Sequence, residues 1–214
     1  MGDYPNFVIG IDKSFSARLL GIVGVLLLNF CTLVLAYWNV IGEFEAIVVL
    51  LILLLGTVLT IISYIRFWFG TKKVKEDNSR ASLAVILIPI ITILILCNSV
   101  FMVFPFLVDS DFSIFVDITI SILEIVTVYI LSNSIIKCTI SEAKKEMLKI
   151  GEKSDIVVIA PFLLTTLSKI VSVMMRSNAE VMFVLTIASY VLSIIADVLF
   201  LYFLSRARRS IEDH

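Results

Sequence analysis

Acidic side chains recur at helical spacing inside a long apolar stretch of this sequence. Asp117, Ser121, Glu124 and Thr127 are separated by four, three and three positions, which places them on one face of a helix. A carboxylate in hydrocarbon costs several kcal/mol unless it is paired, hydrated or protonated. We therefore expect this polar stripe to face other helices or an aqueous cavity.

Two later apolar stretches carry stripes of the same kind. Their members are Thr165, Lys169, Ser172 and Arg176 in one stretch, and Thr186, Tyr190, Ser193 and Asp197 in the next. Three consecutive helices with one polar face each are expected to turn these faces toward one another.

Counting residues from the expected helix ends gives the depth of each charge. By this count Glu124 and Lys169 lie at the same depth, roughly 20 Å from one membrane face. Asp117 and Arg176 share a second depth, farther from that face. The sequence thus allows two ion pairs, Glu124 with Lys169 and Asp117 with Arg176. Such pairs can form a functional site, or they can only fix which helices meet and in what register. We interpret the Asp117/Arg176 pair as structural.

Asp197 has no basic residue at its own depth in this count, so we expect it to be the proton-exchanging group. Desolvation favours the neutral form of an unpaired buried carboxyl. Two alternatives stay open: a neutral Asp197 hydrogen-bonded to Ser193, or an ionised Asp197 that shares Lys169 with Glu124. The candidate transport or proton site is therefore Asp197, Glu124 and Lys169.

The composition predicts the elements that must position these residues. The chain of 214 residues is 60% hydrophobic and 16% charged, and its mean hydropathy is +1.08. This is typical of a polytopic membrane protein, whose lipid-facing backbone must be helical or closed into a barrel. The strands of a barrel would alternate polar with apolar residues, so we predict an all-α fold in contact with the lipid bilayer. The net charge of -1 gives no electrostatic basis for a nucleic-acid partner.

Six transmembrane helices in three hairpins are expected, each near the length that a bilayer requires. A cytoplasmic or interfacial segment, 1–15, would precede the six-helix domain, 16–204, and a cytoplasmic tail, 205–214, would follow it. The expected spans are about 16–40, 44–69, 82–107, 112–138, 156–176 and 181–204.

Lysine and arginine residues predict the orientation. They gather on one side of the expected helices, from Lys13 and Arg18 near the N-terminus to Arg206, Arg208 and Arg209 in the tail. Both termini are therefore predicted to be cytoplasmic.

The second and third hairpins resemble each other. Glu124, Tyr129 and Ser132 match Asp197, Tyr202 and Ser205 in spacing, and Pro89 and Pro161 each follow a serine by seven positions. The pattern favours duplication of hairpins two and three. Chance matches in low-complexity apolar sequence remain the alternative.

Enzymatic activity is not expected. The single histidine is His214, the last residue, which argues against Ser/His catalysis and against most histidine-ligated metal sites. No nucleotide-binding glycine motif is present, and we expect neither a cofactor nor a metal.

The stripes favour a small transporter or channel-like permease, linked to protons through Asp197. The alternative is a non-transporting membrane subunit or assembly factor whose stripes only mediate helix packing. Because six helices enclose little space, we expect a homodimer or a place in a larger membrane complex.

Overall fold

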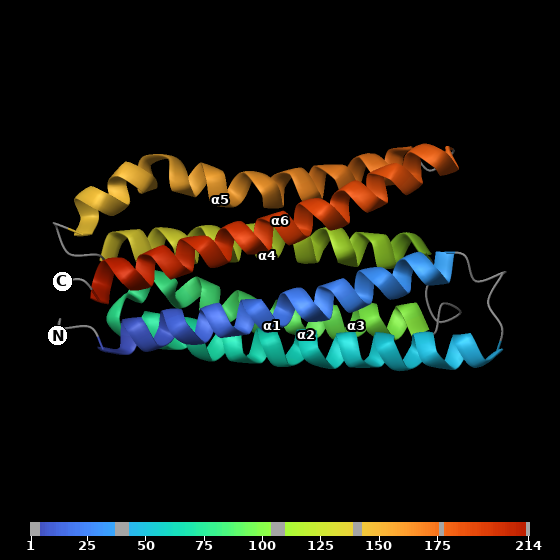
Figure 1. Ribbon diagram of the computed structural model, residues 1–214, viewed down its shortest axis with the longest axis horizontal. Helices are drawn as coiled ribbons and strands as arrows, with labels where there is room; N and C mark the ends of the chain where they lie inside the picture. The colour runs from blue at the N-terminus through green and yellow to red at the C-terminus, as the bar shows by residue number, and fades with distance from the viewer. Residues whose placement is uncertain (1–4, 37–42, 104–109, 139–142, 176–177, 213–214) are drawn as a thin grey trace.

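The described residues form six α-helices that run side by side, with both described chain ends at the same end of the bundle (Figure 1). The computed structural model describes residues 5–36, 43–103, 110–138, 143–175 and 178–212. The helices are α1 (Pro5–Ala36), α2 (Glu43–Asp77), α3 (Ser82–Val103), α4 (Ser110–Cys138), α5 (Ala143–Met174) and α6 (Ala179–Glu212), with a short 3-10 turn, η2 (Ser79–Ala81), before α3. The predicted all-α membrane fold is confirmed.

Five of these helices are long and apolar enough to cross a bilayer, and α5 contributes a shorter apolar section, Val158–Met174. Their outward surface is rich in exposed aliphatic side chains, such as Leu51, Leu54, Ile93 and Leu167. Large apolar side chains exposed in this way on a helical bundle suit contact with lipid.

Several helices extend beyond the expected spans at the end that carries the chain termini, which we call the terminal end. Helix α1 begins at Pro5 rather than near residue 16, α2 continues to Asp77, and α6 continues to Glu212. Hydropathy detects only the apolar part of a helix, so helical ends that carry lysine, aspartate or arginine escape it. Pro5 suits the first position of α1, where no hydrogen-bonded N–H is required.

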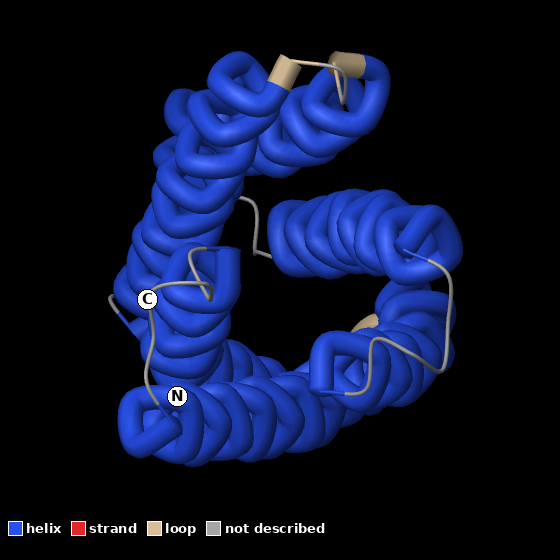
Figure 2. The backbone as a smooth tube through the Cα atoms, turned by 90° about the vertical axis from the view of Figure 1, so that its right-hand side faces the viewer, coloured by secondary structure: helices blue, strands red, loops and turns tan. Residues whose placement is uncertain are grey.

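The helices form a ring (Figure 2). Each helix packs against the next one in chain order, and α6 packs against α1. In such a ring α1 and α4 are not neighbours along their backbones. Side chains from these two helices can meet only across the middle.

Helices α1 and α2 are held at short distance by small residues. A Cβ atom added at Gly10 would lie 2.8 Å from the carbonyl oxygen of Gly70, so only glycine fits there without displacement. The Ser63 hydroxyl of α2 donates to the Ala17 carbonyl of α1 over 2.7 Å. This bond fixes the register of the two helices next to Arg18 and Tyr64.

The main apolar core fills the terminal half of the ring. Phe67, Phe200 and Phe203 lie there, with ring centroids 6.2 Å apart for Phe67 and Phe200 and 6.3 Å apart for Phe200 and Phe203. Leu131 and Leu204 are fully buried beside them. The terminal end of the ring is therefore closed by packed side chains.

Candidate functional site

A cavity of about 410 Å³ lies inside the ring, between the apolar core and the opposite end of the bundle. All six helices line it. Its charged lining residues are Arg18, Asp117, Glu124, Lys169 and Asp197, and its polar ones include Asn29, Thr32, Tyr64, Asn98, Ser99, Ser113, Ser121, Tyr190 and Ser193. A cavity with this many polar groups, in a bundle whose outer surface is apolar, is a candidate binding site.

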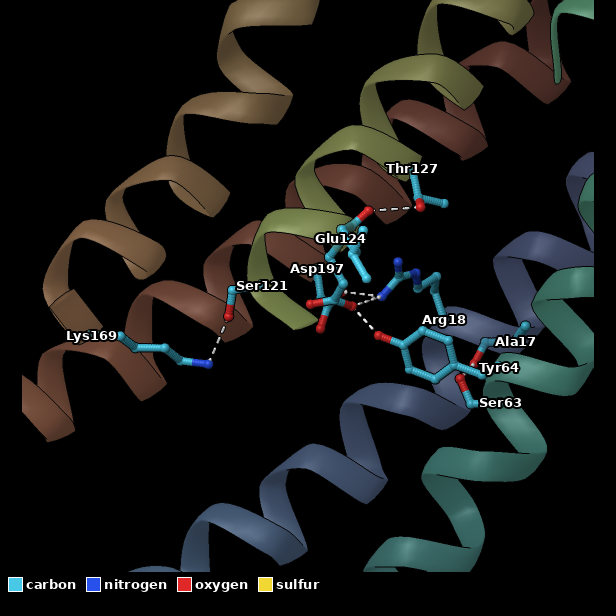
Figure 3. Close-up of polar contacts among 10 residues, drawn as sticks. Ala17, Arg18, Ser63, Tyr64, Ser121, Glu124, Thr127, Lys169 and Asp197 are labelled. Atoms are coloured by element: carbon cyan, nitrogen blue, oxygen red, sulfur yellow. Dashed lines mark hydrogen bonds and ion pairs between the residues drawn. The ribbon is translucent and has the colours of Figure 1, made fainter. Parts of the chain in front are cut away.

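Arg18 forms the base of the cavity (Figure 3). Its Nη1 lies 3.1 Å from Glu124 Oε1 and 3.3 Å from Asp197 Oδ1. The Tyr64 hydroxyl donates to the same oxygen of Glu124. Side chains from α1, α2, α4 and α6 thus meet at one point, and we call these four residues the Arg18 cluster.

The four residues of the Arg18 cluster share one depth. Arg18 is thirteen residues after Pro5, and Tyr64, Glu124 and Asp197 precede the ends of α2, α4 and α6 by thirteen, fourteen and fifteen residues. At about 1.5 Å per residue, each lies roughly 20 Å from the terminal end. This places the cluster near the middle of the bundle.

Aromatic rings surround the guanidinium of Arg18. Its Cζ lies 4.5 Å from the ring centroid of Phe67, 5.5 Å from that of Tyr64 and 5.6 Å from that of Phe200. These distances fit cation–π contacts. Nε and Nη2 of Arg18 are buried and have no hydrogen-bond partner among the described residues. The rings and the two carboxylates therefore hold the charge of Arg18 in place.

A second charged group lies farther from the terminal end. Lys169 of α5 binds Asp117 of α4 over 3.0 Å and Ser121 over 2.9 Å. Asp117 and Glu124 are seven residues apart on one face of α4, which separates the two charged levels by roughly 10 Å.

Exposure rises from the base of the cavity to this second level. The side chains of Arg18 and Asp197 are 6% and 9% exposed, whereas those of Lys169 and Asp117 are 23% and 42% exposed. The cavity therefore opens away from the terminal end.

Many hydroxyl groups of the wall donate to the carbonyl one turn earlier in their own helix. Thr32 donates to Leu28, and Ser99 to Ile95, over 3.0 and 2.9 Å. A hydroxyl bonded in this way already donates its one hydrogen, but its oxygen can still accept a hydrogen bond from another group. The wall is consequently rich in hydrogen-bond acceptors.

Two expectations drawn from depth are wrong, one pairing and one expected lack of a partner. Lys169 pairs with Asp117 rather than Glu124, and Asp197 has a base at its own depth, Arg18. Depth counting fixes the position along each axis, but it does not tell which helices face each other across the ring. Arg176, the expected partner of Asp117, lies outside the described residues.

Sequence reasoning missed Arg18 and Tyr64. From the sequence alone, Arg18 counts only as a charge of the N-terminal side, at the start of the expected span 16–40 and shortly after Asp12 and Lys13. The run Phe7–Ile11 before that pair is apolar, and this signal could have extended α1 toward Pro5 and put Arg18 inside the membrane.

The fold and the cavity together define a polytopic membrane protein with a charged site enclosed by six helices. Comparison with protein-family models, curated proteins and solved structures finds no match to this chain.

Proposed function

We propose that this protein is a small membrane transporter that binds a polar solute in the central cavity and exchanges protons at Glu124 and Asp197. The observation that carries the proposal is the position of the Arg18 cluster. The cluster lies between a packed aromatic core and a cavity of about 410 Å³ whose lining includes many charged and polar side chains. A structural ion pair needs no such cavity beside it.

The geometry fits one state of an alternating-access cycle. The cavity is open at one end and closed at the other, where Phe67 and Phe200 pack directly against Arg18. To release a solute toward the terminal end, α1 and α6 would have to separate from α4 around the cluster. A switch of this kind needs two arrangements of similar energy, and protonation of a carboxylate that binds Arg18 can shift their balance.

The positive charges support an orientation with both termini in the cytoplasm. Lys72, Lys73 and Lys75 occupy the terminal end of α2, and Arg206 and Arg209 occupy that of α6. In this orientation the cavity faces away from the cytoplasm.

A homodimer is not needed for this function. The expectation of a dimer came from the small space that six helices were thought to enclose, whereas a single copy contains the whole cavity. We therefore propose one chain as the transporting unit.

Replacement of Asp197 by asparagine is expected to remove proton movement. In sealed proteoliposomes with the membrane voltage clamped by valinomycin and potassium, a pH jump should produce a lumenal pH change in the wild type, because a protein that can also change state without solute carries protons alone. Asp197→Asn should slow this change at least tenfold, because the amide cannot exchange a proton with Glu124 and the cavity water.

Asp12→Asn is the matched control. Asp12 pairs with Arg208 at 3.1 Å and is 41% exposed, so the same change is made outside the cavity, and the wild-type rate is expected. Equal rates in the wild type, Asp197→Asn and protein-free vesicles would contradict the proposal and favour a non-transporting membrane subunit.

A further inference from the structure

We propose, on the basis of the transporter function above, that the solute is an organic cation of single charge that exchanges for a proton at Glu124 and Asp197. The charge, the geometry and the size of the cavity all favour a solute of this class.

The cavity carries more acid than base. Its described ionic lining consists of two cations, Arg18 and Lys169, and three acids, Asp117, Glu124 and Asp197. With every group ionised, the balance is one negative charge. Because Arg18 and Asp197 at the base of the cavity are buried, that charge attracts a cation more strongly than it would in bulk water.

The excess negative charge lies at the base of the cavity. Lys169 and Asp117 neutralise each other over 3.0 Å. Arg18 binds both remaining acids, Glu124 and Asp197, through one nitrogen atom, Nη1. One positive charge therefore faces two carboxylates, and a second cation would complete the balance.

Among the described residues of the surrounding helices, no further charged side chain lines the cavity. Helix α2 contributes Tyr64, whose hydroxyl donates to Glu124. Helix α3, Ser82–Val103, contains no charged residue and lines the cavity with Ile95, Asn98 and Ser99. The Glu124 side chain is 20% exposed, so a cation in the cavity can reach it.

Size and lining indicate an organic molecule. Pockets for small organic ligands usually measure about 300–1,000 Å³, and this cavity measures about 410 Å³. Tyr64 and Tyr190 line it together with the acceptor-rich hydroxyl groups. Aromatic rings and acceptor oxygens are the groups that bind quaternary and primary ammonium ions.

Cation and proton are expected to exclude each other. When Glu124 or Asp197 takes up one proton from water, the excess negative charge disappears and the cation loses its electrostatic partner. When a cation enters, that proton returns to water. Because such coupling is reciprocal, a proton gradient can drive cation exchange with one charge moved in each direction.

The test uses benzyltrimethylammonium and its uncharged isostere, neopentylbenzene, in equilibrium dialysis with the purified protein in lipid nanodiscs. The cation is expected to bind at least tenfold more tightly at pH 8 than at pH 5, and the isostere to show no such change. Equal binding of the two compounds, or tighter binding of the anion benzenesulfonate, would overturn the proposal.

Two variants locate the binding charge. Glu124→Gln is expected to weaken binding of benzyltrimethylammonium at pH 8 at least tenfold. Because this change also alters the Arg18 cluster, Ser193→Lys provides an independent test. Ser193 lines the cavity one helical turn before Asp197, and a lysine there adds the missing positive charge.

Ser193→Lys is expected to bind the cation at least tenfold more weakly than the uncharged variant of similar length, Ser193→Gln. Equal affinities in these two variants would contradict the charge argument. Proton movement that depends on Asp197, combined with no binding of the cation, would overturn this inference while leaving the transporter function in place.

Discussion

Arg18→Met is expected to destabilise the protein by about 3–5 kcal/mol, the range observed when one partner of a buried ion pair is removed. The arginine side chain is 6% exposed and binds both Glu124 and Asp197. Without it, two carboxylates at the middle of the bundle face each other without a counter-charge. Their desolvation and mutual repulsion are the source of the loss.

Thermal unfolding in detergent measures this effect, with the folded fraction at each temperature determined by fluorescence-detected size-exclusion chromatography. Lys169→Met is the comparison, and it should lower the unfolding temperature by much less because its partner Asp117 is 42% exposed. Combining Arg18→Met with Glu124→Gln and Asp197→Asn should restore most of the stability, since the triple variant buries no unpaired charge. Equal stability of Arg18→Met and the wild type would contradict the Arg18 cluster.

Gly24→Leu is expected to separate α1 from α2. A Cβ atom at Gly24 would lie 2.9 Å from the backbone nitrogen of Thr60 and 3.0 Å from the carbonyl oxygen of Gly56. Backbone atoms cannot rotate away as a side chain can, so the helices must move apart. Overpacking of this kind lowers the free energy of unfolding by about 1–3 kcal/mol. Because the contact here is with backbone atoms, we expect a loss of about 3 kcal/mol for this variant.

Val23→Leu is the matched control for this prediction. Val23 precedes Gly24 in α1 and is 47% exposed, so the one added methylene group meets lipid rather than α2. The same unfolding assay should show no loss for Val23→Leu. A stable Gly24→Leu would mean that α1 and α2 are less tightly packed than the structure shows.

Local pattern was enough to predict the helices and their polar faces. Asp117, Ser121 and Glu124 share a face because helical periodicity depends only on the backbone, and all three line the cavity. The apolar runs gave the helix count for the same reason. These features follow from neighbours in the sequence.

The partners of the charges required tertiary structure. Glu124 and Arg18 are 106 residues apart in the chain and meet because the ring brings α1 opposite α4. The close packing of α1 against α2 depends on glycines such as Gly10 and Gly70. A glycine in an apolar stretch of sequence does not indicate which helix it contacts. Periodicity carries no information about either arrangement.

The proposed duplication of hairpins two and three stays a prediction. Glu124 and Asp197, its matched acids, bind the same nitrogen of Arg18. Tyr129 and Tyr202, its matched tyrosines, are both exposed on the outer surface. These two matched positions have similar surroundings, whereas Ser132 is fully buried and its match Ser205 is partly exposed. The structure thus fits a repeat at two of the three positions without requiring one.

Cysteine accessibility in sealed vesicles tests the central claim most directly, namely that a water-filled cavity ends at the Arg18 cluster. Single cysteines would be placed by Ser193→Cys, in the cavity wall, and Ser132→Cys, fully buried toward the terminal end of α4, after replacement of Cys31, Cys97 and Cys138.

A small membrane-impermeant methanethiosulfonate is expected to modify Ser193→Cys from the side opposite the termini and to leave Ser132→Cys unmodified from that side. An unreactive Ser193→Cys, or equal reaction of the two cysteines from that side, would contradict the account.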